Sequence, residues 1–273
     1  MVRRRPLFFY FLIAYAITWI VMIPYTLSTW GVIAGDWSAA FILHTFGPAL
    51  AAIIVTGMIE GRRGLLELRD RMRRWRVGWR WLLFIFVAVP ALLMVGVAIQ
   101  PGALTGFLGV SALDAVRYPL YYFGIWWGGG PFGEEIGWRG FALPRMQPRY
   151  GPLGGTLMLG VLWAFWHLED FLTPSQGGGP GTGWGTFLTN FSIFFLLVMA
   201  LAIILTWLFN HTSGSIFAAI SAHASVDTPQ LALIPLFPAV GVTTLNLAAL
   251  TGFGVPALMI VLLTHGRLGY HRD

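Results

Sequence analysis

The sequence predicts an all-α protein that crosses a membrane several times. Of its 273 residues, 57% are hydrophobic and only 10% are charged, and the mean hydropathy is +0.73. Soluble domains do not combine so apolar a chain with so few charges. At about 20 residues per span, eight spans account for most of the hydrophobic residues. We therefore expect residues 1–273 to form a single integral membrane domain with about eight transmembrane helices.

Apolar runs define the expected spans in order along the chain. The first run follows Arg3–Arg5 but is too long for a signal peptide and lacks a small-residue cleavage site, so we interpret it as a retained span. The fourth contains Gly128–Gly130 and Pro131, which predict a bend within one span. The expected spans are 7–26, 39–58, 81–99, 115–143, 153–171, 187–209, 214–236 and 244–264.

The arginines predict the orientation of these spans. All 17 basic residues are arginine, and eight spans would place nearly all of them on the side that holds both termini. Because arginine-rich short loops stay in the cytoplasm, we expect a multi-pass protein of the cell (inner) membrane with both termini cytoplasmic. The +6 charge then reflects topology, and no nucleic-acid partner is expected. The segments on this side hold Arg3–Arg5, Arg62–Arg80, Arg145, Arg149, Arg267 and Arg272.

Residues 60–80 combine these arginines with a helical apolar stripe. The stripe recurs at steps of three and four, which predicts an amphipathic segment lying along the cytoplasmic membrane surface. A solvated basic loop is the alternative interpretation. The stripe consists of Leu65, Leu68, Met72, Trp75 and Trp79.

Several ionisable residues fall inside the expected spans. Each charge there costs about 2.5 to 3.5 kcal/mol on insertion scales, so a group of them indicates a functional site. Counting about 1.5 Å per residue from the nearest turn places Glu134 and His167 near 20 Å depth, and His223 and Asp227 at about 14 and 20 Å. Three spans therefore bring polar side chains to a similar depth. His44, in the second span, is interpreted as a core histidine.

Spacing within the spans predicts separate roles. Glu135 and Arg139 are four residues apart and are expected to form an intrahelical ion pair that supports the scaffold. Glu134 lies about 100° away around the helix and is left as the free carboxylate. His223 and Asp227 share a helix face, so Asp227 is expected to orient His223 or to accept a hydrogen bond from substrate.

These residue types are suited to hydrolysis by either of two routes. Glu134, His167 and His223 match the ligand types of a catalytic Zn²⁺ site. Alternatively, Glu134 acts as a metal-free general base on water while the histidines stabilise the oxyanion. The chain has no cysteine, and the signatures His-Glu-x-x-His, Gly-x-Ser-Gly and Gly-x-Gly-Asp are absent from it. Glu169 and Asp170 are expected to face water.

Three motifs in residues 130–228 resemble the CPBP intramembrane proteases, also called the type II CAAX prenyl endopeptidase or Abi family. Glu134 to Arg139 match Glu-Glu-x-x-x-Arg. Trp163 stands four residues before His167, where the family usually has phenylalanine. His223 to Asp227 match a third motif that often ends in asparagine.

The resemblance implies an eight-helix fold around a cytosol-facing cavity. It also implies that Glu134 activates water and that His167, His223 and Asp227 complete the site, with Glu135, Arg139 and Trp163 supporting it. The expected partners are membrane lipid and a membrane-associated peptide or protein, lipidated or not, that is cleaved near its C-terminus. The lysine-free, arginine-rich composition suggests a prokaryotic source, in which a prenylated substrate is not expected. A non-catalytic scaffold, a bacteriocin-immunity protein and an ion-coupled transporter are the alternative functions.

Overall fold

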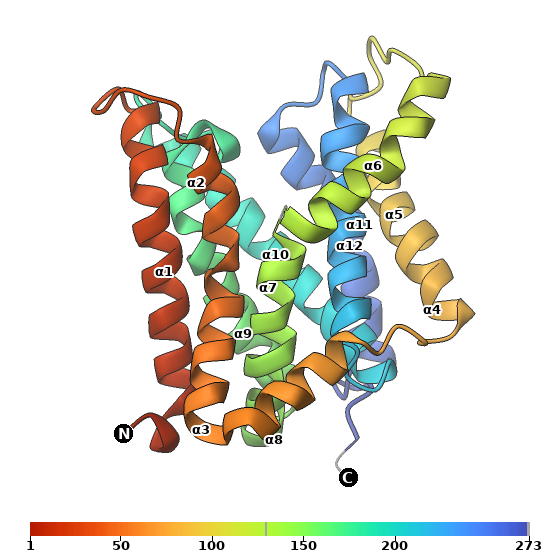
Figure 1. Ribbon diagram of the computed structural model, residues 1–273. Helices are drawn as coiled ribbons and strands as arrows, with labels where there is room; N and C mark the ends of the chain where they lie inside the picture. Colours follow the sequence, from red (N-terminus) through yellow and green to blue (C-terminus); the bar gives the residue numbers. More distant parts are fainter. Residues whose placement is uncertain (129, 272–273) are drawn as a thin grey trace.

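In the computed structural model, which describes residues 1–128 and 130–271, the chain forms a bundle of helices (Figure 1). The described residues contain no strand, so the predicted all-α class is confirmed. Gly129 and Arg272, which entered the predictions of the bend and of the orientation, lie outside the described residues.

The α-helices run as follows: α1 Pro6–Thr29, α2 Ser38–Leu43, α3 Gly47–Met72, α4 Trp79–Leu83, α5 Val89–Ala98, α6 Ala112–Gly128, α7 Pro131–Gly137, α8 Leu143–Tyr150, α9 Pro152–Trp166, α10 Trp184–His211, α11 Ile216–Ala232 and α12 Val242–Leu263. Short 3-10 helices include η2, His44–Phe46, and η5, His167–Leu172. Two π-helical turns, Phe84–Ala88 and Trp138–Ala142, join α4 to α5 and α7 to α8.

Five helical segments among the described residues are long and apolar enough to cross a membrane. A multi-pass membrane protein is therefore supported, but the count of eight spans is not confirmed. Two of the other expected spans contain shorter α-helices, since α9 has 15 residues and α11 has 17. The five segments are Pro6–Thr29, Ser38–Met72, Trp79–Ala98, Trp184–His211 and Val242–Leu263.

The expected fourth span is broken rather than bent. Gly130 has φ 116°, a conformation open to glycine but not to residues with a Cβ atom, and it separates α6 from α7. Pro131 then occupies the first turn of α7, where its missing N–H group costs no helical hydrogen bond. A new helix thus begins inside the bundle, and its first turn carries Glu134.

Residues 60–80, predicted as an amphipathic segment at the membrane surface, are helical only in part. Gly61 (φ 63°, ψ −150°) breaks α3 within its length, and the helix ends at Met72. Leu68 is buried, but Trp75 and Trp79 are exposed. Leu68 therefore packs on the bundle, whereas the two tryptophans remain free to contact lipid.

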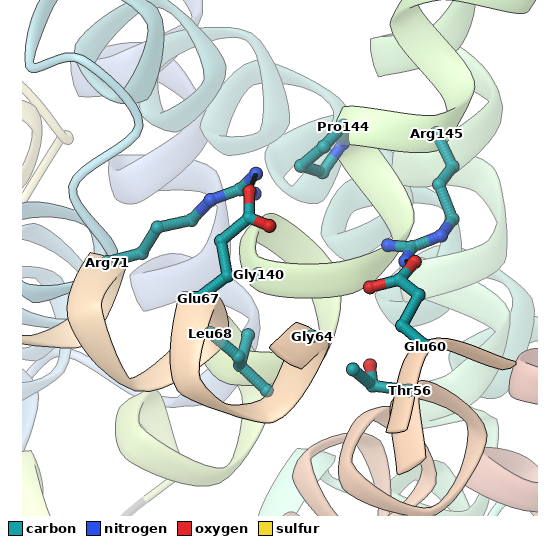
Figure 2. Close-up of a pocket in the computed structure, with 9 residues that line it drawn as sticks. All are labelled: Thr56, Glu60, Gly64, Glu67, Leu68, Arg71, Gly140, Pro144 and Arg145. Carbon is teal, nitrogen blue, oxygen red and sulfur yellow. Dashed lines mark hydrogen bonds and ion pairs between the residues drawn. The ribbon is translucent and has the colours of Figure 1, made fainter. Parts of the chain in front are cut away.

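The second half of α3 runs across the end of the bundle at which α1 begins and α12 ends (Figure 1). There it packs against the α7–α8 segment around a pocket of about 300 Å³. Figure 2 shows Glu60 and Arg145 pointing toward one another across this pocket, and they form an ion pair. Glu67 pairs with Arg71 at 3.0 Å. We call this end of the bundle, where Arg71 and Arg145 lie, the arginine-rich end.

The core of the bundle is made by pairs of helices that contact one another along their lengths. α1 packs on α3, α3 on α7, α9 on α10, and α12 on both α10 and α5. Three tryptophans, Trp138, Trp163 and Trp166, are among the largest fully buried side chains. Two of them, Trp138 and Trp163, donate hydrogen bonds to Glu134.

Candidate active site

The site is built outward from Glu134, in the first turn of α7. Its backbone N–H donates to the carbonyl of Gly130 at 2.9 Å, so the break in the chain fixes the start of the helix. The residue is 3% exposed. Its Oε2 atom accepts hydrogen bonds from Trp163 Nε1 at 2.6 Å and Trp138 Nε1 at 3.3 Å. Two indoles from α9 and from the π-helical turn therefore hold the carboxylate in one orientation.

His167 reaches the same carboxylate from the end of α9. Its Nε2 atom lies 3.7 Å from Glu134 Oε2, which is too long for a direct hydrogen bond. Its Nδ1 atom is 2.9 Å from Asp170 Oδ2, three residues later in η5. This carboxylate fixes the ring so that Nε2 faces Glu134.

Glu135 belongs to a separate network on the neighbouring face of α7. Its Oε1 atom accepts from Arg139 Nη1 at 2.7 Å, which is the ion pair that the four-residue spacing predicts. It also accepts from His223 Nδ1 at 3.0 Å, so α7 is linked to α11. The Arg139 guanidinium lies over the Trp163 ring, 4.6 Å from its centre. Glu135 and Arg139 are both fully buried.

His223 joins this network to Asp227. The Nε2 atom of His223 lies 3.6 Å from Asp227 Oδ2, one helical turn further along α11. The ring also packs edge-on against Trp163, with 5.3 Å between ring centres. His223 is therefore held between Glu135 on one side and Asp227 on the other.

A cavity of about 480 Å³ brings the predicted residues together. Glu134, His167, His223 and Asp227 all line it, as does Trp163. Glu135 and Arg139 do not line it, which agrees with a supporting role. The remaining wall is largely apolar and includes Phe41, Ile125, Phe194, Leu197, Val198, Leu201 and Val226.

The cavity occupies the half of the bundle away from the arginine-rich end. Its lining includes residues of α2, which lies at the opposite end (Figure 1). It also includes Gln230 and Leu231 from the last turns of α11 and Asn246 from the beginning of α12. Cytoplasmic termini and a cytosol-facing cavity were both expected. In this structure the cavity and the chain termini lie toward opposite ends of the bundle.

Three further polar residues that the sequence interpretation set aside lie beside the site. Asp170 and Glu169, expected to face water, are 5% and 6% exposed. His44, taken as a core histidine, is buried but lines the cavity together with Asp170. The contact between His167 and Asp170 could have been predicted, because residues three apart on a helix lie on the same face. His44 lies far away in sequence, so only the packing of η2 against α7 brings it here.

The expected zinc ligands do not form a compact donor set. Within the described residues, the one group of at least three potential ligands whose donor atoms all lie within 4.8 Å of one another is His44, Glu169 and Asp170. Glu134, His167 and His223 are not such a group, because His223 directs Nδ1 toward Glu135 and Nε2 toward Asp227.

Comparisons with known proteins agree with the sequence motifs. Residues 116–228 match the family described as "Type II CAAX prenyl endopeptidase Rce1-like". A curated protein of Methanococcus maripaludis, "CAAX prenyl protease 2", is 29% identical to this chain over 102 residues. The matched region is 36% of this chain and 35% of that relative, so the similarity spans about a third of each protein. The family match contains every residue of the three motifs.

Proposed function

Because residues 116–228 match the Rce1-like family of type II CAAX prenyl endopeptidases, we propose that the protein is an intramembrane endopeptidase. Its substrate is a membrane-associated peptide or protein, cleaved near its C-terminus. One observation carries the proposal: Glu134, whose Oε2 atom is held by two indole N–H groups, faces His167 in the wall of a cavity large enough for a peptide segment.

In the proposed reaction Glu134 acts as a general base. The contacts described above fall on Oε2, so Oε1 takes a proton from a water molecule in the cavity, and the water oxygen attacks the peptide carbonyl carbon. The negative charge then develops on the carbonyl oxygen, where His167 and His223 stabilise it. Glu134 returns the proton to the departing amine as the C–N bond breaks, so the carboxylate is regenerated.

Asp227 has a supporting part in this proposal. It lies 3.6 Å from His223 Nε2 and lines the cavity, so it can orient the imidazole or accept a hydrogen bond from the substrate backbone. Trp163 donates a hydrogen bond to Glu134. Glu135 binds His223, and the Arg139 guanidinium lies over the Trp163 ring. The metal-dependent alternative has less support, because Glu134, His167 and His223 do not form a compact group of donor atoms.

We also propose that both termini are cytoplasmic, because the arginine-rich end satisfies the positive-inside rule. The cavity half of the bundle then lies toward the opposite membrane face. A substrate segment would enter the cavity from that face or from the lipid, not from the cytosol. The cytosol-facing cavity implied by the family resemblance would require the reverse orientation.

The test compares Glu134→Gln with the wild-type protein in proteoliposomes that contain a library of peptides with varied C-terminal sequences, with and without a lipid group. Mass spectrometry detects the truncated products. We expect wild-type cleavage and a loss of at least about 100-fold in the variant, which is the usual scale of general-base catalysis. Glutamine still accepts the indole hydrogen bonds, so the thermal unfolding midpoint should change little.

Glu67→Gln is the matched control, since Glu67 is a carboxylate of α3 outside the cavity, and it should cleave at the wild-type rate. Full activity of Glu134→Gln would remove Glu134 from the mechanism. If wild-type protein cleaves no peptide and Glu134→Gln retains the cellular phenotype, a non-catalytic scaffold or immunity function is favoured instead.

A further inference from the structure

A second cluster of ionisable side chains lies beside the candidate active site and is not used by the proposed reaction. His44 comes from η2, between α2 and α3, and Glu169 and Asp170 come from η5. The His44 Nε2 atom is 3.9 Å from Glu169 Oε1 and 3.8 Å from Asp170 Oδ1. Exposed fractions of 2%, 6% and 5% place all three residues inside the protein.

Three of the four carboxylate oxygens in this cluster lack hydrogen bonds. Neither oxygen of Glu169 has a hydrogen-bond partner, and neither does Oδ1 of Asp170, although each of these atoms is fully buried. Among the ion pairs of the described residues, neither carboxylate meets an arginine. Two buried carboxylates that face only imidazole groups are costly, so a bound cation would stabilise the cluster.

The geometry of the three donors suits a bound divalent cation. Ligands about 2.1 Å from one ion lie roughly 3.0 to 4.2 Å apart, depending on the coordination geometry. The two separations at His44 fall within that range, and all donor atoms lie within 4.8 Å of one another. One imidazole and two carboxylates are ligand types that Zn²⁺ and Mn²⁺ accept.

The surrounding structure fixes the ligands. The carbonyl of His44 accepts a hydrogen bond from Thr18 Oγ1 at 2.8 Å, and its ring stacks on Trp166 with 5.8 Å between centres. The carbonyl of Asp170 accepts from Thr173 Oγ1 at 2.8 Å. Both His44 and Asp170 line the cavity, so an ion can reach the cluster and keep a water ligand on the cavity side.

We propose that His44, Glu169 and Asp170 form a binding site for one divalent transition-metal cation, with Zn²⁺ as the preferred ion. Asp170 links this site to the candidate active site, because Oδ1 faces His44 while Oδ2 binds His167 Nδ1 at 2.9 Å. The ion therefore positions His167 through Asp170 and does not contact the reacting atoms. The inference concerns ion binding and does not depend on the protein being a protease.

The test measures metal content in the full-length protein purified in detergent. The protein is stripped with a chelator, dialysed against Zn²⁺ or Mn²⁺, and analysed by elemental mass spectrometry and by calorimetric titration. We expect about one ion per chain in the wild type and an affinity at least about 10-fold lower in Glu169→Gln. Zn²⁺ should also raise the thermal unfolding midpoint of the wild type but not that of the variant.

Two further variants make the result specific. Glu134→Gln should keep the ion, since Glu134 is not one of the three ligands, and Glu67→Gln should keep it as an exposed-carboxylate control. Asp170→Asn replaces Glu169→Gln if the latter does not fold. The inference is overturned if the refilled wild type holds no stoichiometric ion. It is also overturned if Glu134→Gln loses the ion while Glu169→Gln retains it, which would place the metal at Glu134, His167 and His223.

Discussion

At the scale of single residues, the two adjacent glutamates of α7 illustrate how one helical step separates two tasks. Glu134 lines the cavity and is held by neutral indole donors. Glu135 lies outside the cavity and is held by Arg139 and His223. Neutralising Glu134 should therefore impair catalysis, whereas neutralising Glu135 should destabilise the fold.

We expect Glu135→Gln to destabilise the protein by about 3 to 5 kcal/mol, because it leaves the buried Arg139 charge without its partner. Thermal unfolding in detergent would measure this against Glu134→Gln, which should unfold near the wild-type temperature. The double variant Glu135→Leu, Arg139→Met removes both charges and should recover part of the loss. Equal unfolding temperatures for Glu135→Gln and wild type would contradict a structural ion pair.

The residue roles show what a sequence can and cannot indicate. Glu134, His167, His223 and Asp227 were predicted from their matched depths and their motifs, and the structure places them around one cavity. Their catalytic roles remain predictions that the activity assay addresses. The partners of Glu135 were only half predictable, since Arg139 is four residues away on one helix but His223 comes from α11.

At the scale of elements, α7 approaches its neighbours through glycines. A Cβ atom added to Gly133 would lie 2.8 Å from the carbonyl carbon of Thr45 and 2.9 Å from the Cα atom of Phe46, both in η2. These are backbone atoms, so the clash is not relieved by a side-chain rotation. Close packing of α7 on η2 thus sets the distance between Glu134 and the segment that carries His44.

We expect Gly133→Ala to destabilise the protein by about 1 to 3 kcal/mol, the usual cost of overpacking, and to reduce cleavage by displacing α7. Gly124→Ala in α6 is the matched control, because nothing lies within 4 Å of the added Cβ atom. That change should be neutral or slightly stabilising. Unfolding midpoints and cleavage rates of the two variants, measured side by side, test the idea; identical behaviour would refute the close-packing argument.

The ends of the helices could be predicted only where a long apolar run by itself defines the helix. The long spans near α1, α10 and α12 follow from hydropathy, and the glycine run before Pro131 indicated an irregularity. Whether that irregularity is a bend or a break depends on the backbone angles of Gly130, which the surrounding packing selects. The extent of the helix after Gly61 likewise depends on which residues find a packing partner.

At the scale of the whole molecule, the arginine-rich end and the cavity lie on opposite halves. The chain has no cysteine, so a single introduced cysteine reports on one location. We expect Gly183→Cys, just before α10, to react with a membrane-impermeant maleimide in intact cells. Arg73→Cys, at the end of α3, should react only after permeabilisation.

Both positions suit the measurement, because Arg73 is exposed and an added side chain at Gly183 meets no neighbour within 4 Å. Labelling of Arg73→Cys but not Gly183→Cys in intact cells would reverse the proposed orientation. The cavity would then face the cytosol, as the family resemblance implies, and the arginines would not follow the positive-inside rule.

The lengths of α9, which ends just before His167, and of α11, which carries His223, have a consequence for the surrounding bilayer. With 15 and 17 residues, α9 and α11 extend about 23 and 26 Å, whereas the hydrocarbon layer is about 30 Å thick. Such hydrophobic mismatch is relieved by local thinning of the lipid around the short elements. Water then approaches the buried carboxylates more closely than in a bilayer of uniform thickness, and lipids with longer acyl chains would oppose that approach.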